Sequence, residues 1–174
     1  MVERERYAVI SCHVERPLDD GVWERFSRLQ AQRPGGFRIA ALMRPPDADA
    51  GEDPELWLAR AREAAARGPL GHHTHWGGPG QARPEGGDPA QRVRREGRWL
   101  TESGLAPTVF CGGGWYFDAA VAGAVVALGY ADCTGRPARP AYLDEGAAWL
   151  QADEPSWLGI DGDRLLELPT THSL

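Results

Sequence analysis

Short apolar runs and longer amphipathic stretches alternate along this chain. The apolar runs have the length of buried strands, and the amphipathic stretches repeat apolar residues at helical spacing. The expected strands cover 7–15, 37–43, 69–76, 107–114, 130–135 and, after an irregular proline-rich stretch, 164–170. The expected helices cover 19–32, with Asp19 or Asp20 as N-cap, then 53–68, 88–104 and 118–129.

Strands and helices that alternate with short connections are typical of parallel sheets with right-handed crossovers. The pattern therefore predicts the α/β class for a single domain over residues 1–174, without an internal repeat. An open doubly wound sheet and a (β/α) barrel both fit this alternation. No G-x-G-x-x-G motif follows the first strand, which argues against a dinucleotide-binding fold.

Composition narrows the function classes. The 174 residues are 42% hydrophobic and 25% charged, as in an ordinary globular domain. The net charge is −6 and the arginines are spread along the chain, so we expect no nucleic-acid partner. The sequence contains no lysine, which excludes Schiff-base chemistry and a P-loop.

The number and spacing of the cysteines and the N-terminal sequence indicate the cellular compartment of the protein. Cys12, Cys111 and Cys133 are odd in number and widely spaced, which does not suggest a disulfide framework. The start "MVERERYAVI" lacks the order of a secretory signal, and no apolar run approaches the ~20 residues of a membrane span. We therefore expect a cytoplasmic protein without a membrane partner.

Histidines collect at the expected strand ends, where ligands bind in parallel α/β folds. His13 and Glu15 are two residues apart, so their side chains share one side of a strand. His73 and His75 share one side by the same rule, and His72 faces the other way. His172 follows the last expected strand. The pattern predicts that imidazoles from separate strands meet at one rim.

Such a cluster suits a divalent metal, because neutral imidazole is a common zinc ligand and a catalytic site keeps three protein ligands. We expect His13, His73 and His75 as the ligands, and zinc as the metal, with cobalt, nickel or iron as alternatives. Glu15 is the expected general base or an alternative ligand, and Asp20 is the reserve base. The simpler alternatives are a solvated histidine-rich loop, a core or rim histidine at His13, an ion pair between Glu15 and Arg16, and a helix-capping role for Asp20.

A substrate pocket is expected beside these groups. Trp76 and Trp115 follow candidate site residues, unlike the other tryptophans, and indole rings commonly stack on sugars. We assign Trp76, Trp115 and His172 to this pocket, with core packing or simple exposure as the alternative for each. Cys111 is interpreted as a small buried hydrophobe.

Two segments resemble the NodB-homology polysaccharide deacetylases, carbohydrate esterase family 4. "ARGPLGHHTHW" is similar to their Gly-x-His-Ser/Thr motif after a helix, and "PTVFCGGGWYFDAAVAGAVVALGY" is similar to their third motif and its helix. The similarity covers roughly residues 7–135. It implies an irregular seven-stranded (β/α) barrel, a zinc-type metal, and removal of N- or O-acetyl groups from sugars.

The chain also departs from this family. Gly77 stands where the second histidine is expected, so His75 is the nearest substitute, and Cys111 replaces the third-motif arginine. His13, Val14 and Glu15 occupy the place of the aspartate pair. The chain ends where another strand–helix unit is expected, which implies a truncated or incomplete barrel whose open edges a homodimer would cover.

These observations predict a metal-dependent hydrolase that removes an acyl group from a carbohydrate or cell-wall precursor. The expected cytoplasmic location favours a soluble, sugar-linked precursor. Loss of the arginine and of the aspartate pair favours one alternative, a deacetylase-like protein that binds carbohydrate or metal without turnover. A deformylase or ring-opening amidase on the same barrel is a third reading.

Overall fold

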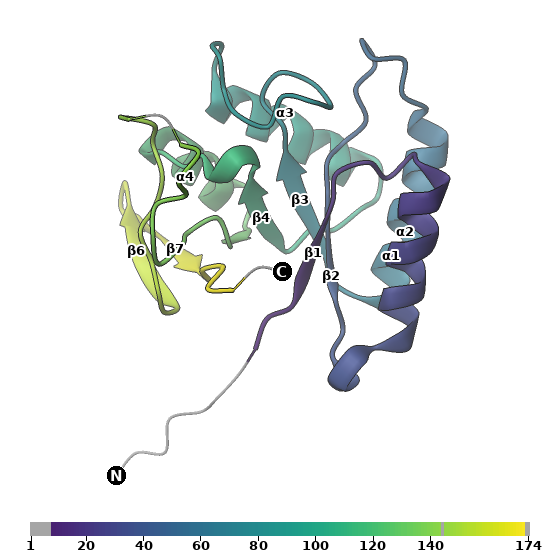
Figure 1. Cartoon of the computed structure of the whole chain (residues 1–174). Coiled ribbons are helices and arrows are strands. Elements are labelled where there is room, and N and C mark those ends of the chain that lie inside the picture. Colours follow the sequence, from purple (N-terminus) through teal and green to yellow (C-terminus); the bar gives the residue numbers. More distant parts are fainter. Residues whose placement is uncertain (1–7, 144, 173–174) are drawn as a thin grey trace.

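Five parallel strands lie side by side in the order in which they occur along the chain (Figure 1). The computed structural model describes residues 8–143 and 145–172. The five strands are β1 (Ser11–Val14), β2 (Ala40–Met43), β3 (Leu70–Thr74), β4 (Val109–Gly112) and β5 (Ala131–Asp132). Each lies within a segment that the apolar pattern predicts, so the sequence-based strands are confirmed and the hydrogen-bonded parts are shorter.

A hairpin extends the sheet beyond β5. β7 (Asp163–Glu167) pairs parallel to β5, and β6 (Ser156–Ile160) pairs antiparallel to β7. The sheet order is therefore β1-β2-β3-β4-β5-β7-β6. β7 confirms the strand expected over 164–170, whereas β6 lies in a stretch for which the sequence predicted no strand. Its residues are only half-buried or exposed, so it lacks the apolar run of an interior strand.

All four expected helices are present: α1 (Asp20–Gln32), α2 (Pro54–Arg67), α3 (Pro89–Glu102) and α4 (Ala119–Ala127). Each is preceded by an aspartate whose carboxylate accepts backbone N–H groups of the first turn, and for α1 this N-cap is Asp19, not Asp20. No helix in the described part of the chain has the length and apolar character needed to cross a bilayer.

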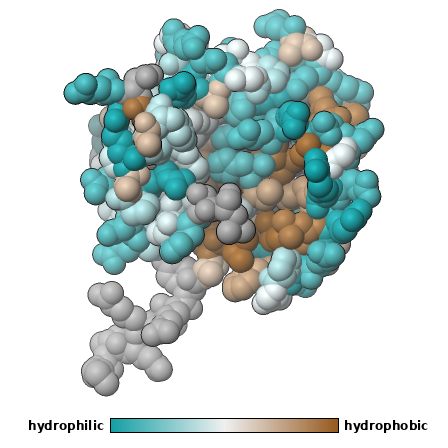
Figure 2. Space-filling model, viewed as in Figure 1, coloured by the Kyte–Doolittle hydropathy of each residue, from teal (hydrophilic) through white to brown (hydrophobic). Residues whose placement is uncertain are grey.

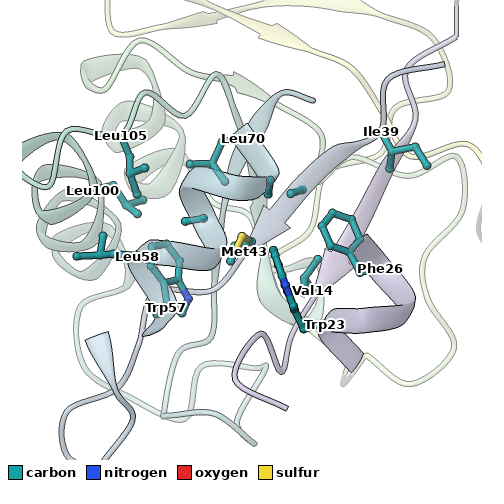
Figure 3. Packing of buried hydrophobic residues seen from close by; sticks show 13 residues of the cluster. Val14, Trp23, Phe26, Ile39, Met43, Trp57, Leu58, Leu70, Leu100 and Leu105 are labelled. Atoms are coloured by element: carbon teal, nitrogen blue, oxygen red, sulfur yellow. The ribbon is translucent and has the colours of Figure 1, made fainter. Parts of the chain in front are cut away.

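The helices cover one face of the sheet, and side-chain alternation along the strands assigns residues to it. Val14, Met43 and Leu70 point into an apolar cluster beneath α1 and α2 (Figure 3). Trp57 of α2 is fully buried there and donates its indole N–H to the Arg44 carbonyl oxygen at 2.7 Å. A second cluster under α3 and α4 contains Phe110 of β4.

The alternate strand residues face the other side of the sheet. Leu42, Cys111 and Cys133 form a small cluster there, against which Trp115 packs. Figure 2 shows hydrophobic residues gathered on this face, and exposed Val9, Ile10 and Phe37 belong to the segments that lead into β1 and β2. The homodimer that the sequence analysis expected at open sheet edges stays a prediction.

The strand order can be compared with the two α/β architectures that fit the sequence, an open doubly wound sheet and a (β/α) barrel. A doubly wound sheet reverses its order at a switch point, whereas β1 to β5 follow one another without reversal. The fold is thus an α/β fold with a seven-stranded, mostly parallel sheet, compatible with a barrel-like arrangement. Within residues 8–143 and 145–172, no ladder joins the end strands β1 and β6.

Two buried carboxyl groups stand opposite each other on β5 and β7. Asp132 and Glu167 are register partners, and neither side chain is exposed. Asp132 accepts hydrogen bonds from Thr134, whereas Glu167 accepts one from the Gly135 N–H at 3.0 Å. Burial, the charge of Asp132 and a hydrogen bond to it raise the pKa of Glu167 to about 11. The folded protein therefore keeps a proton on this pair at neutral pH.

Replacing Glu167 with Gln should flatten the pH dependence of stability. Folded wild type holds the Glu167 proton up to about pH 11, whereas an unfolded glutamate loses it above its ordinary pKa of 4.5. Wild-type stability should accordingly fall as pH rises through this window, by up to about 1.4 kcal/mol per pH unit. Urea unfolding of Glu167→Gln at pH 6 and pH 9 should show a shallower decline.

Glu154→Gln is the matched control, because Glu154 is exposed and its removal should leave the wild-type slope unchanged. Equal slopes for wild type and Glu167→Gln would contradict the buried proton.

Candidate metal centre

Two imidazoles at the end of β3 are held in the same tautomer by backbone carbonyl groups. His73 Nδ1 lies 2.8 Å from the Cys111 carbonyl oxygen, and His75 Nδ1 lies 2.8 Å from that of Pro79. A carbonyl oxygen only accepts, so Nδ1 carries the proton on each ring and donates it. Each Nε2 is left with a free lone pair, which is the arrangement of histidines that ligate metals.

The two Nε2 atoms are buried, have no hydrogen-bond partner in the described part of the chain, and approach the same oxygen. Glu15 Oε1 lies 3.9 Å from His73 Nε2 and 4.0 Å from His75 Nε2. Lone pairs cannot donate to a carboxylate, so an ion between these three atoms would satisfy all of them. Glu15 is 53% exposed, which leaves this point open to solvent.

Near neutral pH neither ring carries a second proton, so neither Nε2 donates a hydrogen bond to Glu15. Burial, together with nearby His13 and His75, holds the pKa of His73 well below its ordinary value of 6.5. Burial likewise lowers the pKa of His75, although the Pro79 carbonyl and Glu15 act in the opposite direction. Both rings are therefore neutral at pH 7, as metal coordination requires.

The described residues contain two overlapping groups that could hold a metal ion. Glu15, His73 and His75 form the first, which we call the outer group, and His13, His73 and Cys111 form the second, the inner group. Within each group the ligand atoms lie within 4.8 Å of one another. No group found in the described residues joins His13 to His75. The three-histidine set expected from the sequence is therefore divided, with His73 common to both parts.

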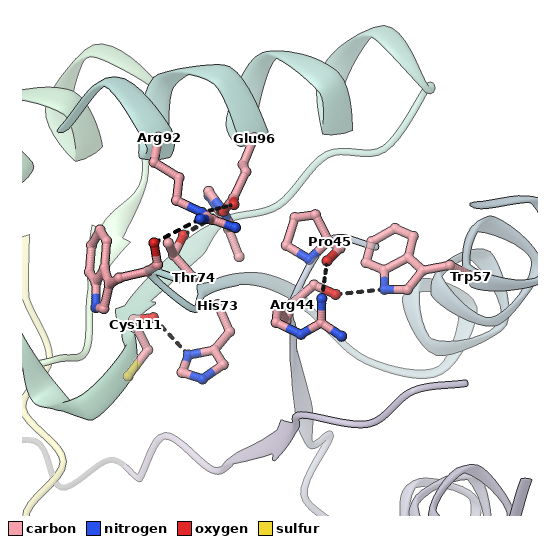
Figure 4. Close-up of polar contacts among 10 residues, drawn as sticks. Arg44, Pro45, Trp57, His73, Thr74, Arg92, Glu96 and Cys111 are labelled. Carbon is pink, nitrogen blue, oxygen red and sulfur yellow. Dashed lines mark hydrogen bonds and ion pairs between the residues drawn. The ribbon is translucent and has the colours of Figure 1, made fainter. Parts of the chain in front are cut away.

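The opposite side of β3 anchors this geometry. Thr74 points toward α3 and donates to Glu96 Oε2 at 2.8 Å (Figure 4). His72 lies on the same side of the strand, with its Nε2 3.0 Å from the same oxygen. Arg92 donates to Glu96 Oε1 at 2.7 Å. Burial alone would raise the pKa of Glu96, but these partners lower it. His72 is thus a structural residue facing away from the cluster, as its spacing predicts.

The glycine run after β4 lets the chain pass close to His75. A Cβ on Gly113 would clash with the Thr74 carbonyl oxygen and lie 2.7 Å from that of Ala82. Trp115 then adopts a left-handed conformation with φ of 60°, which is unusual for a residue with a side chain. Only a residue without a side chain fits at position 113, so the run has a structural reason beside the site.

Trp115 is the expected pocket residue that lies beside the histidines. Its ring centroid is 5.4 Å from that of His13, and His13 is in turn 4.6 Å from His73. The Arg136 guanidinium lies over the indole, 4.3 Å from the ring centroid. Trp115 and Arg136 therefore form a wall next to the inner group.

Three other expected site residues lie outside both groups. Trp76 is buried in the second apolar cluster, where its indole N–H donates to the Gly113 carbonyl oxygen at 2.8 Å and its ring packs on Tyr116. Asp20 is exposed on α1 and paired with Arg60. His172 is exposed, with Nδ1 3.0 Å from the Thr171 hydroxyl. Core packing, an ion pair and exposure account for them.

Sequence reasoning missed two residues of this region. Cys111 was taken as a packing residue, but it is the register partner of His73 and joins the inner group. Arg44, only 3% exposed at the end of β2, contributes a positive charge that lowers the pKa of His75. A pocket of about 450 Å³ between α4 and β6 contains none of the histidines, so concavity alone does not locate the cluster.

Comparison with known proteins adds no relative: no family model matches the chain, and no curated protein matches it significantly. The resemblance to polysaccharide deacetylases therefore depends on the motifs quoted from residues 66–76 and 107–130.

Cation binding should depend on His73 more than on any other histidine, because His73 belongs to both groups. Zinc or cobalt should raise the melting temperature of wild type, and His73→Ala should weaken binding by more than about 100-fold, the range seen for residues that only support ligands. Calorimetric titration at pH 7 measures the affinity.

His172→Ala is the matched histidine control and should bind like wild type. Unchanged affinity in His73→Ala, or a loss in His172→Ala, would contradict the ligand assignment.

Proposed function

We propose that this protein is a metal-dependent hydrolase that removes an acyl group, such as acetyl, from a small carbohydrate or sugar-linked substrate. The observation that supports it is the approach of two buried, unprotonated Nε2 atoms to one carboxylate oxygen. Two imidazoles and one carboxylate are a known ligand set of catalytic zinc sites, which leave a further position for water or substrate.

In this proposal His73, His75 and Glu15 hold the cation. A divalent ion bound there would polarise an acyl carbonyl and make a water molecule acidic enough to attack it near neutral pH. The exposed side of Glu15 is the direction from which a substrate would approach. The sequence allowed Glu15 to be either a general base or a metal ligand. In this proposal it is a ligand.

His13 is the best placed proton carrier of the described residues. It is half-buried, its ring lies next to His73, and burial lowers its pKa, so it is neutral at pH 7. A neutral imidazole accepts a proton from the attacking water and returns it to the departing amine or alcohol. Asp20 does not compete for this role, because it pairs with Arg60 on the helix surface.

The carbohydrate part of the proposal depends on the resemblance to the deacetylases and on the wall beside the site. Trp115 offers an aromatic surface and Arg136 a cationic one, and both suit the hydroxyl and phosphate groups of a sugar-linked molecule. The proposal names only the class of substrate, and activity assays on acetylated sugars would identify the substrate itself.

One observation favours a second candidate, a protein that binds metal or carbohydrate without turnover. The inner group contains a fully buried thiol, and among the described residues no carboxylate base joins either group once Glu15 serves as a ligand. A site built in this way would hold an ion without an additional acidic residue for proton transfer.

His13→Gln should separate the two candidates. With zinc or cobalt bound, the wild type should release acetate from N-acetylglucosamine or an O-acetylated sugar, and His13→Gln should lower kcat by about 100-fold or more while KM changes little. Acetate release is measured directly, and metal content is measured on the same samples.

Asp20→Asn should keep the wild-type kcat. A chain that binds metal but releases no acetate would support the binding protein, whereas loss of kcat in Asp20→Asn but not in His13→Gln would overturn the assignment of the base.

A further inference from the structure

The Cys111 thiol makes only long contacts to backbone carbonyl groups, unlike its neighbour Cys133, and the two thiols interact with each other. Cys133 Sγ donates to the Phe110 carbonyl oxygen at 3.1 Å, which is a short contact for sulfur. Cys111 Sγ lies 3.9 Å from the Gly112 carbonyl oxygen and 4.0 Å from that of Cys133. Cys133 is therefore a structural residue, whereas the Cys111 sulfur has lone pairs to offer.

Strand register directs this sulfur toward the histidines. Cys111 pairs with His73 across β3 and β4, and both residues lie on the sheet face opposite the helices. His13 reaches the same face from β1, which pairs with β2 rather than with β3. The three ligand atoms lie within 4.8 Å of one another, and His73 Nε2 is buried without a partner.

We propose that the inner group, His13, His73 and Cys111, is a second metal site, which selects thiophilic ions such as cadmium, zinc or copper(I). We call this site the inner seat and the site of the outer group the outer seat. Two imidazoles and a thiolate are a soft ligand set, whereas the outer group supplies a carboxylate oxygen. The inner seat is also the drier of the two, because Cys111 and His73 are fully buried and Glu15 is half exposed.

The two seats exclude one another. His73 Nδ1 is committed to the Cys111 carbonyl, so its single Nε2 lone pair binds one ion at a time. An ion in the inner seat also occupies His13, which the proposed hydrolysis uses to carry a proton. Thiophilic ions in this seat should accordingly inhibit turnover, and this consequence alone rests on the proposed function.

The binding step releases one proton. The Cys111 S–H bond breaks as the sulfur–metal bond forms, and the proton passes to solvent or buffer, while the neutral imidazoles bind without proton loss. No electron is transferred, so the step needs no oxidant or reductant.

Cadmium titration of the full chain tests the inner seat through the ultraviolet absorption of a cadmium–thiolate bond. The chain has three cysteines, so a Cys12→Ser, Cys133→Ser background leaves Cys111 as the sole thiol. In this background the band should saturate at one cadmium per chain. Adding Cys111→Ser should abolish it, and adding His13→Gln should weaken cadmium binding by more than about 100-fold.

Glu15→Gln is the matched control, because it changes only the outer group, and it should keep the band. Absence of the band in the folded Cys111-only protein, or its retention after Cys111→Ser, would overturn the inner seat. Circular dichroism verifies folding, and His13→Gln provides a second variant that leaves the thiol in place.

The same samples separate this inference from the proposed hydrolysis. Acetate release by wild type without a cadmium–thiolate band would overturn the inner seat alone. A band that follows the expected pattern, in a protein that releases no acetate with any metal, would overturn the hydrolase alone.

Discussion

The anchoring of β3 to α3 is the constraint on which the candidate site depends. Glu96 binds His72 and Thr74 on the helix side of the strand, and Arg92 holds the same carboxylate. Because side chains alternate along a strand, fixing these residues fixes His73 and His75 on the opposite side. A slip of one residue would exchange the two sets and remove both free Nε2 atoms from the cluster.

Among the described residues, both sides of β3 carry a buried ring nitrogen without a hydrogen-bond partner, and on the helix side this atom is His72 Nδ1. Glu96 has partners on both carboxylate oxygens, whereas His73 Nε2 and His75 Nε2 have none although they are buried. An unsatisfied buried polar atom costs about 1–3 kcal/mol. On the side that faces Glu15, two such atoms lie close to one carboxylate oxygen, where a single ion would satisfy both.

Much of the fold follows from local sequence, and less of the site does. Apolar runs, aspartate caps and helical spacing identify the four helices and six of the seven strands, because these signals are local. β6 was missed since an edge strand with exposed residues carries no apolar run. Period-two spacing predicted the shared face of His73 and His75, but not that Trp76 packs in the core.

The division of the histidines into two groups could not be read from the sequence, because it depends on distances between strands. His13 and His75 share a rim, yet β2 separates β1 from β3, and only His73 lies close to both neighbours. Cys111 enters the inner group through its pairing with His73, a relation set by the register of β3 and β4. Spacing along one strand fixes which side a residue faces, whereas pairing between strands fixes which ligands meet. The metal sites proposed for this chain therefore depend on strand register as much as on its histidines.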